Sequence, residues 1–245
     1  MKKFFAIFLI FALVGSLAAC SNTPSDSSKT SDMSTSSADL PSSGRDEISE
    51  VEDESKGMTQ TDGSNILIAY FTMPEDVDTT GVDAVAGASV VVNNDEVMGN
   101  VEYMASIIQN TVGGDLFQIE TVQQYPLDHD TLVDQAAEEQ DTGARPELST
   151  HIENLDQYDI IFLGYPNWWG DLPMPLYTFL EEYDFGGKTI IPFCPHGGSG
   201  FSRTESTIAE LQPEATVSEN GLTISRNDVS GSAQEVASWA ESLGL

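Results

Sequence analysis

The most constraining feature of the sequence is an alternation of buried-strand patterns with segments of helical period, which begins at Asn65. Residues 66–71 form a continuous apolar run, which is typical of a parallel strand buried on both faces. Strand and helix patterns alternate five times, and this predicts an α/β domain with a doubly wound parallel sheet. The predicted strands are 66–71, 116–119, 159–164, 187–194 and 215–224, and the predicted helices lie near 101–112, 131–140, 176–183, 204–211 and 236–243.

The N-terminal segment has the order of a secretory signal peptide. Two lysines precede an apolar run of residues 4–14, and the tetrapeptide Leu-Ala-Ala-Cys ends at Cys20. The run from Phe4 to Ala19 is shorter than the roughly 20 residues that a membrane-spanning helix needs. The tetrapeptide is similar to the bacterial lipobox, whose cysteine becomes the lipid-modified N-terminus after cleavage. We therefore expect a signal peptide at 1–19 and a lipid anchor on Cys20 that holds the protein at the extracytoplasmic face of the membrane.

Residues 21–64 differ from the rest of the chain in composition. Of these 44 residues, 18 are Ser or Thr and 10 are acidic, and only Leu40, Ile48 and Val51 are bulky aliphatics. Such a segment cannot bury enough apolar surface to offset its conformational entropy. We predict a lipidated cysteine and a flexible tether over 20–64, and one folded domain over 65–245.

The charge of the chain excludes several partners. The sequence has 40 acidic and 9 basic residues, a formal net charge of −31. Nucleic acids bind to stripes of Lys and Arg, and anionic lipid headgroups attract basic segments, so neither is an expected partner of the domain surface. Two cysteines, one of them in the signal segment, exclude a disulfide framework.

Three loops follow the predicted strands at the edge where doubly wound sheets bind ligands. The first begins at Thr72 and leads to a helix N-terminus, which favours anions. The second contains the paired indoles Trp168 and Trp169, and the third, residues 195–201, is rich in glycine. Together these loops suit a planar aromatic ligand that carries a phosphate.

Two of these loops carry a family resemblance. Pro-Asn-Trp-Trp-Gly at 166–170 and His-Gly-Gly-Ser-Gly at 196–200 are similar to loops of flavodoxin-like domains, and the resemblance extends over 65–245. It implies a three-layer sandwich around a five-stranded parallel sheet of order 2-1-3-4-5, with FMN as cofactor. The residues that it assigns to FMN are Thr72, Gly99, Asn100, Val101, Pro166, Asn167, Trp168, Trp169, Gly170, His196, Gly197, Gly198 and Gly200.

The chain departs from the family at the phosphate loop, where flavodoxins have Ser/Thr-x-Thr-Gly-x-Thr. Thr72 matches the opening hydroxyl, but residues 73–98 are inserted before the motif resumes at Gly99, and Val101 replaces the closing Thr. Valines on either side of a polar turn at 93–96 predict a small hairpin in the insertion. After position 64 the basic residues are Arg145, Lys188, Arg203 and Arg226, and all four lie outside these segments. Neutral donors are therefore expected to hold the phosphate: Thr72, Asn100 and the main-chain N–H groups at the start of the first helix.

The resemblance leaves three functions open. The protein is either an electron carrier that serves a redox partner protein or small acceptor, an FMN-dependent reductase of the NAD(P)H or quinone type, or a flavin-free binding module. A carrier or a partner-fed reductase is favoured, because no dinucleotide fingerprint G-x-G-x-x-G is present. A serine nucleophile is disfavoured because Phe201 replaces the last glycine of the nucleophile elbow. The histidines lack metal-ligand spacing, and Cys194 at a strand end is expected to be buried.

The anchor at Cys20 predicts where the protein is found in the cell. The native protein should fractionate with membranes, and Cys20→Ala should release it or leave it unprocessed. Fractionation with immunoblotting checks this. A Cys20→Ala variant that is processed and retained like the native protein would contradict the lipid anchor.

Overall fold

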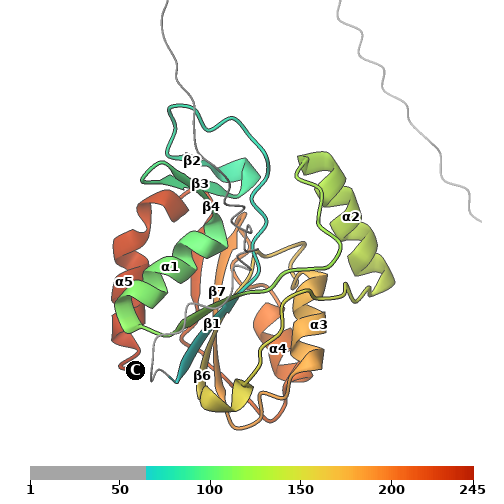
Figure 1. Cartoon of the computed structure of the whole chain (residues 1–245), viewed down its shortest axis with the longest axis vertical. Coiled ribbons are helices and arrows are strands. Elements are labelled where there is room, and N and C mark those ends of the chain that lie inside the picture. The colour runs from blue at the N-terminus through green and yellow to red at the C-terminus, as the bar shows by residue number, and fades with distance from the viewer. Residues whose placement is uncertain (1–64) are drawn as a thin grey trace, which may run out of the picture. The chain divides into compact units, whose positions relative to one another are not determined.

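The computed structural model describes residues 65–245; the predicted signal peptide, Cys20 and tether lie outside the described residues (Figure 1). The main sheet is parallel and has the order β5-β1-β6-β7-β8, with β9 also paired to β7. Because β8 and β9 both occupy the fifth position, this confirms the predicted order 2-1-3-4-5. The strands are β1 (Ile66–Tyr70), β5 (Asp115–Gln118), β6 (Ile160–Gly164), β7 (Thr189–His196), β8 (Thr216–Val217) and β9 (Leu222–Ser225).

Helices cover both faces of the sheet and confirm the three-layer sandwich (Figure 1). One layer holds α1 (Asn100–Val112) and α5 (Ala233–Ser242). The other holds α3 (Met174–Glu182) and α4 (Thr204–Leu211), with α2 (His129–Thr142) beside α3. Three short 3₁₀ turns complete the elements: η1 (Ala86–Ala88), η2 (Leu155–Gln157) and η3 (Val229–Gly231). No helix in residues 65–245 is long and apolar enough to cross a membrane.

The core explains why β1 is an unbroken apolar run. Its side chains alternate between the two layers: Leu67 and Ala69 join the cluster under α3 and α4, whereas Ile66 and Ile68 join the cluster under α1 and α5. All five residues of the strand are buried. A strand covered on both faces needs an apolar residue at every position, as its sequence predicts.

The insertion after β1 forms its own antiparallel sheet of β2 (Ala84–Val85), β3 (Val90–Asn93) and β4 (Glu96–Gly99). The predicted hairpin is confirmed. Its turn residues Asn94 and Asp95 have φ angles of 51° and 66°, as a type I′ turn requires. The third strand was not predicted because two residues give no periodic signal.

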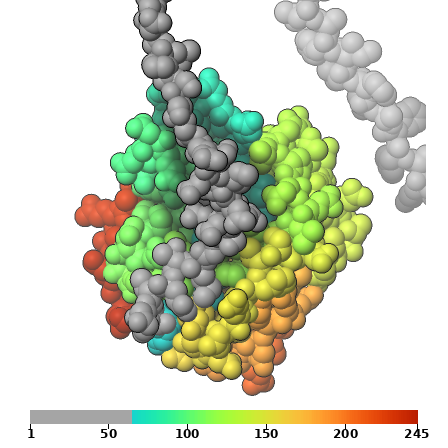
Figure 2. Space-filling view, in the orientation of Figure 1, coloured from blue at the N-terminus to red at the C-terminus, as the bar shows by residue number. Residues whose placement is uncertain are grey.

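The insertion is fastened to the start of α2. The Asp76 N–H donates to the Leu127 carbonyl at 3.2 Å, and the Glu75 carboxylate lies 2.8 Å from His129 Nδ1. In the space-filling view, the inserted segment (teal) and α2 (lime) lie at the same end of the domain (Figure 2). The insertion and α2 are thus joined at one end of the domain, an arrangement that the family motif alone does not predict.

The fifth strand differs from the prediction. A continuous strand over 215–224 was expected, but the structure divides it into β8 and β9. The break lies beside Pro192 of β7, which has no N–H to donate to a neighbouring strand. Gly221 approaches Pro192 so closely that a Cβ there would lie 2.9 Å from the Pro192 carbonyl oxygen.

Candidate functional site

A cavity of about 210 Å³ lies at the carboxyl ends of β1, β6 and β7. This is the edge at which the sequence predicts the ligand site, next to the point where the strand order reverses. The loops after β1, β6 and β7, the first turn of α1, the insertion and α2 all contribute to its lining. The predicted residues in that lining are Thr72, Asn100, Val101, Pro166, Asn167, Trp168, Trp169, His196 and Gly197.

Thr72 carries the first signal of a ligand. Its side chain is buried, with 6% of the residue exposed, and Oγ1 has no hydrogen-bond partner. The hydroxyl lies against Gly99, where a Cβ would stand 2.0 Å from Oγ1. A residue with a Cβ at position 99 would therefore force the Thr72 side chain to move. Thr72 also lines the cavity. A buried polar atom without a partner is costly, so an orphaned hydroxyl in a residue of the cavity wall points to a polar ligand group that it could bind after a small rotation.

Gly99 is also the N-cap of α1, although it does not line the cavity itself. A glycine N-cap has no side-chain oxygen to accept from the free N–H groups of the first turn. The Asn100 N–H donates to the Ser89 carbonyl at 2.9 Å, and the Glu102 carboxylate accepts from the Gly99 N–H at 3.2 Å. The first turn of α1 borders the cavity through Asn100 and Val101, and its dipole favours an anion there.

Val101 stands where the family has a hydroxyl, and its surroundings explain the difference. The residue is buried and packs in one cluster with Val91 of the insertion and Tyr103 of α1, while it also borders the cavity. The inserted sheet thus supplies an apolar neighbour at this position. A threonine at this position would place a polar hydroxyl against these apolar neighbours, which costs stability unless the hydroxyl finds a partner.

The two tryptophans have different surroundings. Trp168 packs edge-on against Phe71 and Tyr125, at centroid distances of 5.6 and 5.9 Å. Trp169 is 53% exposed at the tip of a two-residue turn, which the reciprocal main-chain bonds of Trp168 and Asp171 close. Its φ of 49° is unusual for an aromatic residue, and such strain is often found at functional loops. Trp168 thus packs partly buried against the core and forms part of the cavity wall, and Trp169 is the exposed indole at the rim.

Asn167 joins the tryptophan loop to the glycine-rich loop. Its Nδ2 donates to the Gly200 carbonyl at 2.7 Å, and its Oδ1 accepts from the Gly170 N–H at 2.9 Å. Gly170, Gly198 and Gly200 do not line the cavity. Their φ angles of 80°, 127° and 58° instead show that they permit left-handed turns in the two loops.

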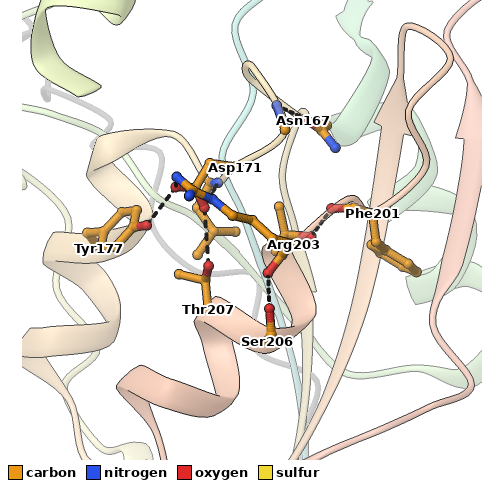
Figure 3. Close-up of polar contacts among 10 residues, drawn as sticks. Asn167, Asp171, Tyr177, Phe201, Arg203, Ser206 and Thr207 are labelled. Atoms are coloured by element: carbon orange, nitrogen blue, oxygen red, sulfur yellow. Dashed lines mark hydrogen bonds and ion pairs between the residues drawn. The ribbon is translucent and has the colours of Figure 1, made fainter. Parts of the chain in front are cut away.

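A buried carboxylate holds the same two loops together (Figure 3). Asp171, 2% exposed, accepts from the Tyr177 hydroxyl at 2.9 Å and from Thr207 Oγ1 at 3.2 Å, and it pairs with the Arg203 guanidinium. Burial, together with the hydrogen bond to Asp171, raises the pKa of Tyr177, which keeps the phenol a donor. Because Arg203 and Thr207 lie at the start of α4, this cluster fixes the tryptophan loop against the end of the glycine-rich loop. The sequence offered no signal for it beyond an isolated Asp.

The structure also places residues in the cavity that the sequence analysis missed. Glu75 and His129 meet across it, and Leu132, Val133 and Ala136 of α2 add an apolar wall. The hydrogen bond with Glu75 raises the pKa of His129, and the nearby charge of Arg226 opposes that shift. Arg226 itself lines the cavity. Arg226 lies outside the segments expected to hold the phosphate, as the sequence predicts, but it reaches the same cavity from the end of β9.

Other reactive groups of the described domain offer no second site. Burial raises the pKa of the Cys194 thiol well above its usual value, so the group stays protonated and unreactive. Within residues 65–245, no group of three His, Cys, Asp or Glu side chains could hold a metal ion.

Fold and site together define a doubly wound α/β domain with its ligand site at the switch point. The family model described as Flavodoxin matches residues 89–243, which is more than half of the chain. The chain therefore belongs to the flavodoxin family.

Three solved structures are similar to the chain. A candidate flavoprotein from Bacteroides uniformis is 26% identical with a TM-score of 0.51, covering 70% of this chain and 99% of its own. A candidate flavoprotein from Bacteroides eggerthii is 24% identical with a TM-score of 0.49, covering 70% and 97%. A flavoprotein from Lactobacillus acidophilus in complex with FMN is 17% identical with a TM-score of 0.47, covering 68% and 96%. No curated protein matches the chain.

Because Asp171 is buried, its ion pair should contribute more to the free energy of unfolding than the half-exposed pair of Arg145 and Glu181. Asp171→Asn should lower the free energy of unfolding by about 1–3 kcal/mol, because it leaves buried donors around a neutral amide. Glu181→Gln breaks the half-exposed Arg145–Glu181 pair and should cost less than about 1 kcal/mol. Urea denaturation of both variants checks this. Equal losses would show that Asp171 does not organise the loops.

Proposed function

We propose that the cavity binds FMN and that the protein acts in electron transfer. The observation that carries the proposal is Thr72, which lines the cavity next to the N-cap of α1 and whose buried hydroxyl has no partner. Membership in the flavodoxin family and the likeness to the Bacteroides uniformis protein support it.

The residues present fit the phosphate end of FMN. Thr72 Oγ1 would donate to a phosphate oxygen, and the main-chain N–H groups at the start of α1 would bind the dianion with the help of the helix dipole. Gly99 has no side chain that could fill this space or cap the helix in place of the ligand. A ligand that supplies acceptors here removes the cost of the unpartnered hydroxyl.

The aromatic side of the cavity fits the isoalloxazine ring. Trp168 and Trp169 provide indoles at the wall and rim, and the 195–197 segment brings main-chain groups of β7 to the same cavity. Bound flavin supplies the redox chemistry, since it accepts and releases electrons one or two at a time. Because Trp169 is exposed at the rim of the cavity, an edge of the ring would stay accessible to a partner.

That accessibility favours an electron carrier, with a redox partner protein or a small acceptor. The second candidate is an FMN-dependent reductase of the NAD(P)H or quinone type. It draws support from the apolar α2 wall formed by Leu132, Val133 and Ala136, which offers a surface for an apolar acceptor. A flavin-free binding module is the alternative that a flavin titration would reveal.

We also propose that the domain works outside the cytoplasmic membrane, as a lipoprotein tethered through Cys20. The support is the order of charged, apolar and small residues before that cysteine and the Ser/Thr-rich composition of 21–64.

The orphaned hydroxyl predicts opposite effects on binding and on stability. Thr72→Val should weaken FMN about 5–30-fold, since a hydrogen bond to a charged group contributes roughly 1–2 kcal/mol, and should leave riboflavin within about twofold. The flavin-free variant should be as stable as the native protein, or more stable, because a buried hydroxyl without a partner has been removed. Calorimetric titration and urea denaturation measure the two effects.

Thr178 provides the matched control. Its Oγ1 is also buried without a partner, but it lies in α3 and does not line the cavity. Thr178→Val should therefore match Thr72→Val in stability and leave the affinity for FMN unchanged. Equal losses of FMN and riboflavin in Thr72→Val, or no loss at all, would contradict a phosphate site at Thr72.

A further inference from the structure

We propose that Arg226 supplies the positive charge that binds the phosphate of FMN in this domain. The inference rests on the proposed function and adds a charged residue to a phosphate site that the sequence predicts to be neutral. Two observations carry it: the side chain lines the cavity without a hydrogen bond or ion pair to another side chain of residues 65–245, and its loop packs on the α1 side of the sheet.

Arg226 differs from the other basic side chains of residues 65–245. Arg145 forms a bidentate pair with Glu181, Arg203 pairs with Asp171, and the Lys188 Nζ donates to the Tyr158 carbonyl at 2.7 Å. In this described part of the chain, the Arg226 guanidinium has no hydrogen bond or ion pair with another side chain, although it lines the cavity. The sequence from position 65 onward has 30 acidic and four basic residues, so an unpaired guanidinium is a notable exception.

The backbone holds Arg226 at the cavity. Its N–H donates to the His196 carbonyl at 2.8 Å, which continues the pairing of β9 with β7 beyond the end of the strand. The next residues turn toward α1: Val229 is buried in one cluster with Val91 and Val101, and the Tyr103 hydroxyl donates to the Ser230 carbonyl at 3.4 Å. Arg226 thus lies in a segment that packs against the first turn of α1 and the inserted sheet.

The neutral donors at the start of α1 would leave the charge of a bound phosphate unbalanced, and a cation at the cavity would add affinity. Glu75 lines the cavity, and the Glu102 carboxylate lies at the first turn of α1. His129 is engaged by Glu75 and does not offset Glu102. A phosphate dianion would meet these carboxylates with only neutral donors from Thr72 and the helix end. A guanidinium offers several N–H donors in a fixed fork that matches phosphate oxygens, and its charge is independent of pH in the working range.

The test compares FMN with riboflavin, which lacks the phosphate, in the full-length protein. Arg226→Gln should weaken FMN about tenfold while riboflavin stays within about twofold, because charge-assisted hydrogen bonds contribute more than neutral ones. Arg226→Lys, which keeps the charge and loses the fork, should recover part of the affinity. Raising the salt concentration should weaken FMN more in the native protein than in Arg226→Gln, since salt screens the lost attraction.

Arg145→Gln is the matched control, because it removes the same charge from a pair outside the cavity. It should leave both affinities unchanged. Arg226 is exposed, so its substitution should not alter the thermal unfolding midpoint, which circular dichroism checks.

Three results would overturn the inference. Equal weakening of FMN and riboflavin by Arg226→Gln, with a lowered flavin reduction potential, would place the guanidinium at the ring. If Arg226→Gln binds FMN as tightly as Arg145→Gln does, while the native protein prefers FMN to riboflavin, the inference is refuted and the proposed function stays intact. A native protein that binds neither flavin would overturn both.

Discussion

The structure of the site depends on one close contact, that of the Thr72 hydroxyl with the backbone of Gly99. Thr72 follows β1 and Gly99 precedes α1, and the inserted residues 73–98 leave and return between them. The inserted sheet restores the junction, because β4 runs directly into the N-cap and the Asn100 N–H is bound by Ser89. The insertion therefore keeps the geometry of a short loop while adding a wall to the cavity. A larger residue at position 99 would displace the Thr72 side chain from this contact.

The site also depends on hydrogen bonds that join the tryptophan loop to the glycine-rich loop. Asn167 bonds to both loops through its amide, and Asp171 bonds to residues at the start of α4. With the loops fixed, Trp168 is supported by Phe71 and Tyr125, and Trp169 alone stands exposed at the rim. A preorganised site of this kind loses little entropy when a planar ligand enters.

Much of the fold could be predicted because buried parallel strands and amphipathic helices leave strong local patterns, as in residues 66–71. The three ligand loops could be predicted from topology, since they follow adjacent strands. The divided fifth strand could not, because the break depends on Pro192 of a neighbouring strand. Arg226, Glu75 and the α2 wall were missed for a related reason: they reach the cavity from segments outside the family motifs, and only tertiary packing brings them there. The Asp171 cluster likewise depends on residues from three separate segments.

The account's central claim is that FMN binds with its phosphate between Thr72, the start of α1 and Arg226. A crystal structure of the protein with FMN tests this most directly. The account predicts phosphate oxygens within hydrogen-bond distance of Thr72 Oγ1 and the Arg226 guanidinium, with the ring extending toward Trp168 and Trp169. A phosphate bound elsewhere, with Thr72 Oγ1 still unpartnered, would contradict it.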